Sequence, residues 1–213
     1  MIPQEVNLRD LVILVADNNM KSALQGILSQ YESIGSRRIS YDIYVHIYHD
    51  PGCLRDSHNF LRPFINRYQF AIVMFDRIGC GKEENSREEI EEIVETNLSR
   101  NGWADRSIAV VLNPELEVWV WSRACIVEEI LGWQNREQTV SDWLTSKSFI
   151  RDGEFSPRSP KEAMEAVLKT VRKPRSSSIY QQLAQTANLD DCDEPSYNKL
   201  STFLRNRFPQ EIQ

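Results

Sequence analysis

The chain has 213 residues, of which 41% are hydrophobic and 26% are charged. This balance is typical of globular proteins and excludes collagen-like, coiled-coil and largely disordered classes. With 25 Lys and Arg residues against 31 Asp and Glu residues, the formal net charge is −6. An excess of acid argues against a simple basic nucleic-acid binder, whose phosphate contacts come from clustered cations. It does not argue against an enzyme that holds a cation between carboxylates.

The cysteines and the apolar segments bear on the location of the protein. Cys53, Cys80, Cys125 and Cys192 lie far apart and form no CxxC pair, which favours a reduced, cytoplasmic protein. The first ten residues lack the basic and apolar layout of a secretory signal peptide. No apolar run approaches the roughly 20 residues needed to span a bilayer, so we expect no membrane insertion.

Short apolar segments alternate with amphipathic helical patterns over the first 113 residues. The expected strands cover residues 10–16, 39–48, 70–75 and 107–112. Apolar residues at helical spacing follow each of the first three strands, and Ser86 with Glu89 has the form of a capping box for the third helix. This β-α-β-α-β-α-β order predicts an α/β fold with a parallel four-stranded sheet and flanking helices.

Beyond Pro114 the chain has the pattern of a helical region. Expected helices cover residues 115–122, 126–131, 140–147, 160–171, 176–187 and 195–207. We therefore expect an α/β domain over residues 1–122 and a helical C-terminal extension, packed on it, over residues 123–213.

Acidic residues and a histidine follow the predicted strands. Asp17 follows the first strand, His49 the second and Asp76 the third, and Glu115 and Glu117 come after the fourth. Open α/β sheets bind ligands outside the carboxyl ends of their strands. Converging carboxylates repel one another unless a cation lies between them, and hard oxygen ligands suit Mg²⁺ or Mn²⁺. The four acids are therefore candidate metal ligands, and His49 is a candidate general base.

Each of these residues also has a structural role open to it. Asp17 and Asp76 could cap helices or form turns. Glu115 and Glu117 could complement a helix dipole, and His49 could belong to a Pro-Gly turn that closes the second strand. A zinc site made of His49, Cys53 and Cys80 would have suitable ligands, but no paired spacing supports it.

A glycine-containing loop with two cations follows Asp76. It contains Gly79, Gly81 and Lys82, but no Ser or Thr follows the lysine, so it is not a Walker phosphate loop. Arg77 and Lys82 would lie near the acidic strand ends. They are therefore candidate phosphate-binding residues.

Several short motifs resemble the Toprim fold, and in particular small Toprim-like proteins of bacterial methylation-associated anti-phage defence systems. The motifs are VADNNM (15–20), HDPGC (49–53), FDRIGCGKEENSREEIE (75–91), GWADRS (102–107), NPELEVWVWS (113–122), SPKEAM (159–164) and KPRSSSIYQQLA (173–184). The likeness runs over nearly the whole chain. It implies a Mg²⁺-dependent nuclease or phosphodiesterase that works with other defence-system proteins and acts on DNA or RNA.

The chain departs from the Toprim pattern at two metal-ligand positions. The first strand of Toprim enzymes normally delivers Glu followed by Gly, where this chain has Asp17-Asn18, and the third normally delivers Asp-x-Asp, where this chain has Asp76-Arg77-Ile78. These departures argue against a two-metal mechanism. They leave two hypotheses: a metal-dependent nuclease that uses Asp17, Asp76 and Glu117, or a catalytically degenerate adaptor or sensor subunit that docks on a protein partner through the Trp-rich helical half.

Overall fold

The computed structural model describes residues 8–121, 127–134, 136–151, 154, 156–186 and 194–210. Its contacts divide the chain into two compact units. The sheet unit comprises Met1–Asp17 and Arg38–Val111, and the helical unit comprises Asn18–Arg37 and Leu112–Gln213. The expected domain boundary at residue 122 stays a prediction.

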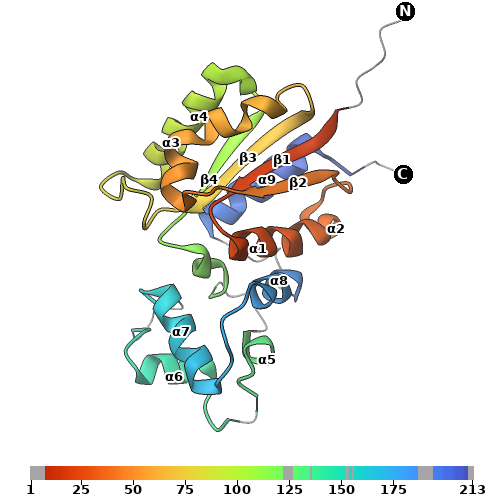
Figure 1. The fold of residues 1–213 in the computed structure, drawn as a ribbon. Coiled ribbons are helices and arrows are strands. Elements are labelled where there is room, and N and C mark those ends of the chain that lie inside the picture. The colour runs from red at the N-terminus through yellow and green to blue at the C-terminus, as the bar shows by residue number, and fades with distance from the viewer. Residues whose placement is uncertain are drawn as a thin grey trace, which may run out of the picture. The chain divides into compact units, whose positions relative to one another are not determined.

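The sheet unit is built on four parallel strands, which confirms the predicted α/β fold (Figure 1). The strands are β1 (Arg9–Val15), β2 (Tyr41–Val45), β3 (Tyr68–Asp76) and β4 (Ser107–Leu112), and their order in the sheet is β2-β1-β3-β4. Residues 11–15 of β1 are completely buried. Burying an aliphatic side chain stabilises a fold by roughly 1.5–3 kcal/mol, so this continuous apolar run fixes β1 in the centre of the sheet.

Two longer helices of the sheet unit pack together beside the strands (Figure 1). Helix α3 (His49–Leu61) continues into the 3-10 helix η1 (Arg62–Phe64), and α4 (Arg87–Leu98) continues into the π-helical turn η2 (Ser99–Trp103). Helix α3 contacts β1, β3 and α4.

The connection from β2 to α3 differs from the sequence-based expectation. Strand β2 ends at Val45 rather than at residue 48, and Pro51 and Gly52 lie in the first turn of α3 instead of a turn that closes the strand. Proline is tolerated there because the first helical N–H groups have no partner within the helix. Strand β3 begins at Tyr68, two residues before the predicted start at residue 70.

Helix α4 begins at the predicted capping box and protects the edge of the sheet. Ser86 accepts a hydrogen bond from the Glu89 N–H while the Glu89 side chain accepts one from the Ser86 N–H. On the buried side, Glu91 accepts a hydrogen bond from Val111 N–H at 2.9 Å. Glu95 accepts one from Ala109 N–H at 2.9 Å. These carboxylates satisfy donors on the outer edge of β4 that would otherwise be open to another strand.

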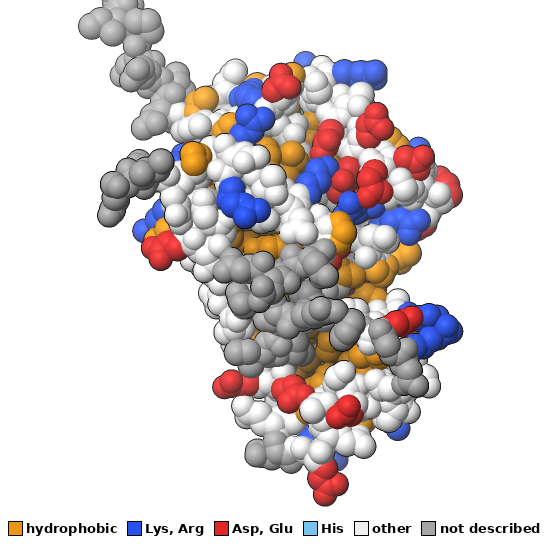
Figure 2. Space-filling view, turned by 180° about the vertical axis from the view of Figure 1, so that it is seen from behind, with side chains coloured by type: hydrophobic (Ala, Val, Ile, Leu, Met, Phe, Trp, Pro, Cys, Tyr) orange, Lys and Arg blue, Asp and Glu red, His pale blue; other side chains and the backbone are white. Residues whose placement is uncertain are grey.

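The other acids of α4 face away from the sheet. The Glu88, Glu89 and Glu92 side chains are exposed, and Figure 2 shows red acidic side chains gathered over this part of the surface. Part of the negative net charge therefore belongs to a solvated helix face.

The helical unit contains the predicted C-terminal helices together with the segment between β1 and β2. Its elements are α1 (Asn18–Ser29), α2 (Tyr31–Ile34), the 3-10 helix η3 (Leu116–Trp119), α5 (Val127–Leu131), α6 (Val140–Ser146), α7 (Pro160–Val171), α8 (Ser177–Thr186) and α9 (Pro195–Arg207). Helix α1 packs against α8, where Ser177 donates a hydrogen bond to Asn19 Oδ1 at 2.9 Å.

The tryptophans of the helical unit contribute mainly to its core. Trp121 and Trp133 are buried, and their indole N–H groups donate to the carbonyls of Pro160 and Gln138. Trp119 is half-buried and donates to Glu194 and Ser196. Satisfied, buried indoles are typical of core residues. Docking of a protein partner through this helical half stays a prediction.

Two further sequence-based expectations concern membranes and cysteines. Among the residues that the structure describes, every helix is too short or too polar to cross a membrane. Cys53 and Cys80 are buried free thiols, whereas Cys125 and Cys192 lie outside the described residues.

Candidate functional site

Two of the predicted acids, Asp17 and Asp76, come together at the carboxyl ends of neighbouring strands. Strand β1 pairs with β3 so that Val15 lies opposite Met74, and Asp17 and Asp76 each come two residues after this pair. Strand β2 lies on one side of β1, whereas β3 and β4 lie on the other. This is the switch point at which open α/β sheets bind their ligands.

His49 lies at the same edge, at the start of α3. Its Nδ1 is 2.9 Å from the carbonyl oxygen of Ala16, the last residue before Asp17. Because a carbonyl only accepts hydrogen bonds, Nδ1 carries the proton in this contact and the lone pair of the neutral ring is on Nε2. The backbone of His49 has φ 49°, a left-handed conformation that is uncommon outside glycine. The ring is therefore held in one orientation at the cost of some backbone strain.

Asp50 follows β2 together with His49, but it was not among the predicted metal ligands. Its Oδ1 accepts a hydrogen bond from the backbone N–H of Asp76 at 2.9 Å, which ties α3 to the end of β3. Burial raises the pKa of the Asp50 carboxyl, and the negative charge of Asp17 acts in the same direction, while the Asp76 N–H opposes them. A raised pKa caused by burial beside a second acid is typical of functional sites. The available signal was an acid in the first turn of a helix that follows a strand.

His46 lies next to this edge and contacts the start of α3. It is buried, and its Nδ1 accepts a hydrogen bond from Tyr48 N–H at 3.1 Å. Burial lowers the pKa of His46, so the neutral ring is favoured. A Cβ atom at Gly52 would lie 2.0 Å from the same Nδ1. Glycine is therefore required where α3 crosses this ring.

The two described cysteines do not provide a zinc site. Burial raises the pKa of Cys53 well above its ordinary value, with the charges of Asp50 and Asp17 adding to the effect. Burial also raises the pKa of Cys80. Among the described residues, Cys53 and Cys80 belong to no group of three or more His, Cys, Asp or Glu side chains that could hold a metal ion.

Arg77 and Lys82 lie on the loop after β3, but they differ in their surroundings. The Arg77 guanidinium donates to the backbone carbonyls of Asn85, at 3.0 Å, and of Glu83, and so holds the loop closed. Lys82 is exposed. Of the two predicted phosphate-binding residues, Lys82 is thus the one whose side chain faces solvent.

Glu117, which lies in the helical unit, is occupied by partners from α8 and the segment before it. It is 1% exposed, and its Oε1 accepts hydrogen bonds from Arg175 Nη2 at 2.6 Å and Tyr180 Oη at 2.5 Å. Burial raises the pKa of Tyr180, and the charge of Glu117 raises it further. Glu115 pairs with Lys161 Nζ at 3.2 Å. Each of these two carboxylates therefore already has a cationic partner within the helical unit.

Two of the four predicted metal ligands, Glu115 and Glu117, are already paired with cations. Among the residues that the structure describes, no group of three or more His, Cys, Asp or Glu side chains is arranged to hold a metal ion. Mg²⁺ usually keeps several water ligands and is bound by only one or two carboxylates. The metal-ligand role of Asp17 and Asp76 stays a prediction.

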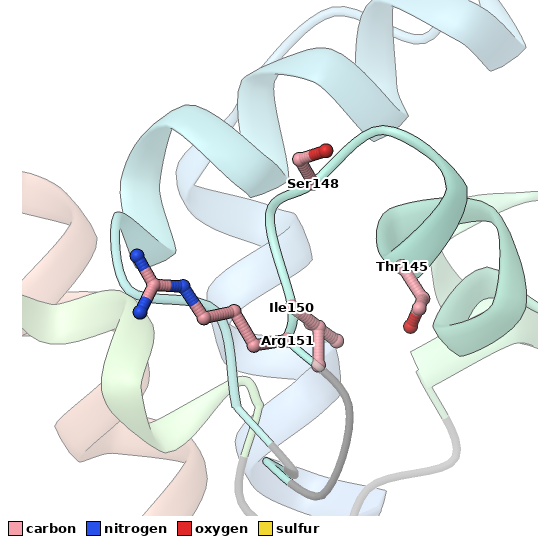
Figure 3. A pocket seen from close by; sticks show the side chains of 4 residues that line it. All are labelled: Thr145, Ser148, Ile150 and Arg151. Atoms are coloured by element: carbon pink, nitrogen blue, oxygen red, sulfur yellow. The ribbon is translucent and has the colours of Figure 1, made fainter.

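A pocket in the helical unit has a different character (Figure 3). It is lined by Thr145, Ser148, Ile150 and Arg151. The Arg151 guanidinium extends away from Thr145 in Figure 3. Among the described residues that line the pocket, Arg151 is the one that is charged. Because its guanidinium points away from Thr145, no charged groups of these residues converge in the pocket, and we assign it no chemistry.

Comparisons with protein-family models, curated proteins and solved structures found no match to this chain. The site is therefore interpreted from its own geometry.

Proposed function

We propose that this protein is a non-catalytic, Toprim-like adaptor or sensor subunit of a bacterial anti-phage defence system. The observation that carries this proposal is the pairing of Glu117 with Arg175 and Tyr180. The nuclease hypothesis needs Glu117 as a ligand beside Asp17 and Asp76, but a buried carboxylate with a cation at 2.6 Å already has its counter-charge. The departures from the Toprim pattern at Asp17-Asn18 and Asp76-Arg77-Ile78 point in the same direction.

The partner-binding surface in this proposal is the strand-end edge of the sheet unit. Ile47, Tyr48 and Ile78 are 75%, 68% and 46% exposed, and they are the exposed large hydrophobic side chains of the described residues. They follow β2 and β3, the strands on either side of β1. Apolar side chains that gather on one edge are typical of protein contacts. We therefore expect a protein partner that presents apolar side chains to this edge.

Two assays on the full chain test the proposal. With Mg²⁺ or Mn²⁺ and single-stranded DNA, duplex DNA or RNA, we expect no more cleavage by the wild type than by Asp76→Ala. Metal-dependent cleavage that Asp76→Ala abolishes would establish the nuclease hypothesis instead.

The second assay measures binding to the proteins encoded beside this gene by analytical ultracentrifugation. Replacing Ile47, Tyr48 and Ile78 together by Ser is expected to weaken the complex by at least about tenfold, since buried apolar anchors dominate interfaces. Asn66→Ser is the control, because Asn66 is exposed before the opposite end of β3. If the triple variant and the control bind the partner with equal affinity, the partner does not bind at the strand-end edge.

Phosphodiester hydrolysis with His49 as general base is a second proposal, favoured by one specific observation. The contact from Nδ1 to the Ala16 carbonyl leaves the lone pair on Nε2, in the form that can accept a proton from water. General bases typically contribute about 10²–10⁴-fold to a rate. Any cleavage activity should therefore fall by about that factor in His49→Gln. It should remain in His58→Gln, which changes a histidine of α3 far along the helix from the strand ends.

A further inference from the structure

Two glycines of the loop after β3 direct their backbone N–H groups at one carboxylate oxygen. Gly79 N–H donates to Glu83 Oε1 at 2.9 Å, and Gly81 N–H donates to the same atom at 3.0 Å. Both glycines have positive φ, 89° and 86°, which other residues rarely adopt. Successive N–H groups that converge through such a turn form an anion-binding nest. We call the N–H groups of Gly79 and Gly81 the loop nest.

Three cations belong to the loop that carries the nest or lie against it. Arg77 fixes the loop through the Glu83 and Asn85 carbonyls. The Arg55 guanidinium lies against Gly81, because a Cβ atom added at Gly81 would be 2.9 Å from Arg55 Nη2. Lys82 is exposed beside the nest. Within the part of the chain that the structure describes, neither Arg55 nor Lys82 forms an ion pair.

Acidic groups also face this loop. Besides Glu83, a Cβ atom added at Gly79 would lie 4.0 Å from Asp50 Oδ2, and Glu84 is exposed next along the chain. The Glu83 carboxylate satisfies both N–H donors. Arg55 and Lys82 then have no anionic partner from this carboxylate. An ion with more oxygen atoms and more negative charge than a carboxylate could bind both N–H groups and also pair with these two cations.

We propose that the loop nest is the binding site for a phosphate-bearing ligand, and that the Glu83 carboxylate occupies this site until the ligand displaces it. The phosphate oxygens would accept from the Gly79 and Gly81 N–H groups and pair with Arg55 and Lys82. Such charge-assisted hydrogen bonds are stronger than neutral ones. The inference deepens the proposed sensor function and rests on it, because it names the chemical class that the strand-end edge would detect.

The electrostatics of Glu83 agree with this assignment. The Gly81 N–H, together with that of Gly79, lowers the pKa of the Glu83 carboxyl. A site that stabilises the charged form of a carboxylate in this way stabilises other anions by the same hydrogen bonds. The Glu83 carboxylate thus competes with an external anion for the two N–H groups. Removing this carboxylate should leave both N–H groups available to the ligand.

The test is a titration of the ¹⁵N-labelled full chain with inorganic phosphate and, in a separate arm, with adenosine 5′-monophosphate. The amide signals of Gly79 and Gly81 report the occupancy of the nest. Glu83→Ala is expected to bind about tenfold more tightly than the wild type, a gain of about 1.4 kcal/mol. Adding Lys82→Ala to this variant should reverse the gain. Responses to both probes assign the phosphate group itself, and a response to the nucleotide alone assigns a phosphate monoester.

Glu84→Ala is the matched control, since it removes an equal charge from the adjacent exposed position. Equal gains in Glu83→Ala and Glu84→Ala would reduce the effect to net charge and overturn the inference. Should Glu83→Ala disorder the loop, Glu83→Gln keeps an acceptor for both N–H groups and is expected to bind phosphate more tightly than the wild type. Unmoved Gly79 and Gly81 signals in both variants at millimolar phosphate overturn the inference, and an unaffected partner complex would then leave the proposed adaptor function standing.

Discussion

Carboxylates are held in different ways in the two units. In the helical unit, Glu117 and Glu115 each lie within 3.2 Å of a cation from the same unit. In the sheet unit, Asp50 is half-buried near the charge of Asp17 and accepts its hydrogen bond from a backbone N–H. The first arrangement compensates charge where it is buried, and the second brings like charges together.

This difference separates a structural use of carboxylates from a binding use. A buried carboxylate with a matched cation is costly to disturb but has little capacity for a ligand. Neighbouring acids raise the energy of the folded chain, and a bound ligand, a proton or a hydrogen-bond donor relieves that repulsion. Substitutions in the two units should therefore change stability by different amounts and with different signs.

The largest effect is expected from Arg175→Met. Methionine keeps much of the aliphatic volume but leaves Glu117, which is 1% exposed, without its cation. Breaking a buried ion pair by removing one partner costs about 3–5 kcal/mol. Because Arg175 is 29% exposed, we expect a loss near 3 kcal/mol in urea-induced unfolding.

The double variant Glu117→Gln with Arg175→Met is the control for this loss. It carries no buried charge, so it should recover a large part of the stability that Arg175→Met loses. If the two variants are equally unstable, the loss comes from packing rather than from an uncompensated charge.

A smaller loss is expected from Glu91→Ala in the sheet unit. Glu91 is buried and accepts from Val111 N–H at 2.9 Å, so alanine leaves a donor of the edge strand unsatisfied. An unsatisfied buried donor costs about 1–3 kcal/mol. The neighbouring exposed Glu92→Ala is the matched control and should change the free energy of unfolding by no more than about 0.5 kcal/mol. Similar losses in both variants would contradict the edge-capping role of Glu91.

The sheet and most helices could be predicted because their signals are local. The apolar runs of β1, β3 and β4 and the capping box at Ser86 specify their elements within a few residues. The start of α3 was missed, because Pro51 and Gly52 have the composition of a turn. Gly52 is instead required by the contact with the His46 ring, a tertiary feature that sequence spacing does not reveal.

The candidate site was predicted only in part, for a related reason. Strand ends locate Asp17 and Asp76, since register brings the ends of neighbouring parallel strands together. The partners of Glu117 lie 58 and 63 residues away, and no local pattern in the sequence connects them. The same holds for Arg55, whose position against Gly81 depends on how α3 packs beside the loop.

A still smaller effect is expected from Lys161→Met. Lys161 is 40% exposed and pairs with Glu115, which is 14% exposed. Ion pairs near the surface contribute about 0.2–1 kcal/mol and are screened by salt. The loss should therefore appear in urea-induced unfolding at low ionic strength and disappear at about 1 M NaCl. A loss that salt leaves unchanged would show that the lysine acts through its aliphatic chain.

Asp50→Asn is expected to change stability least and in the opposite direction. Asparagine keeps an oxygen that can accept from the Asp76 N–H but removes the charge near Asp17. Because burial raises the pKa of Asp50 above its ordinary value of 3.8, the folded chain holds this proton more tightly than the unfolded chain. The wild type should therefore lose stability from this group as the pH rises from about 3.8 to the raised pKa.

The difference between the unfolding free energies of Asp50→Asn and the wild type, measured from pH 3 to pH 7, isolates this contribution. We expect the variant to be more stable at pH 7 by about 0.5 kcal/mol, the size of a partly screened charge interaction, and the difference to vanish below the ordinary pKa. A variant that is less stable at pH 7 would mean that the Asp50 charge stabilises the fold, as the Glu117 charge does with Arg175. If Asp50→Asn is instead more stable than the wild type at pH 7, the chain keeps a carboxylate at its strand ends that destabilises the fold. Binding sites commonly contain such residues, because groups selected for function are often unfavourable for stability.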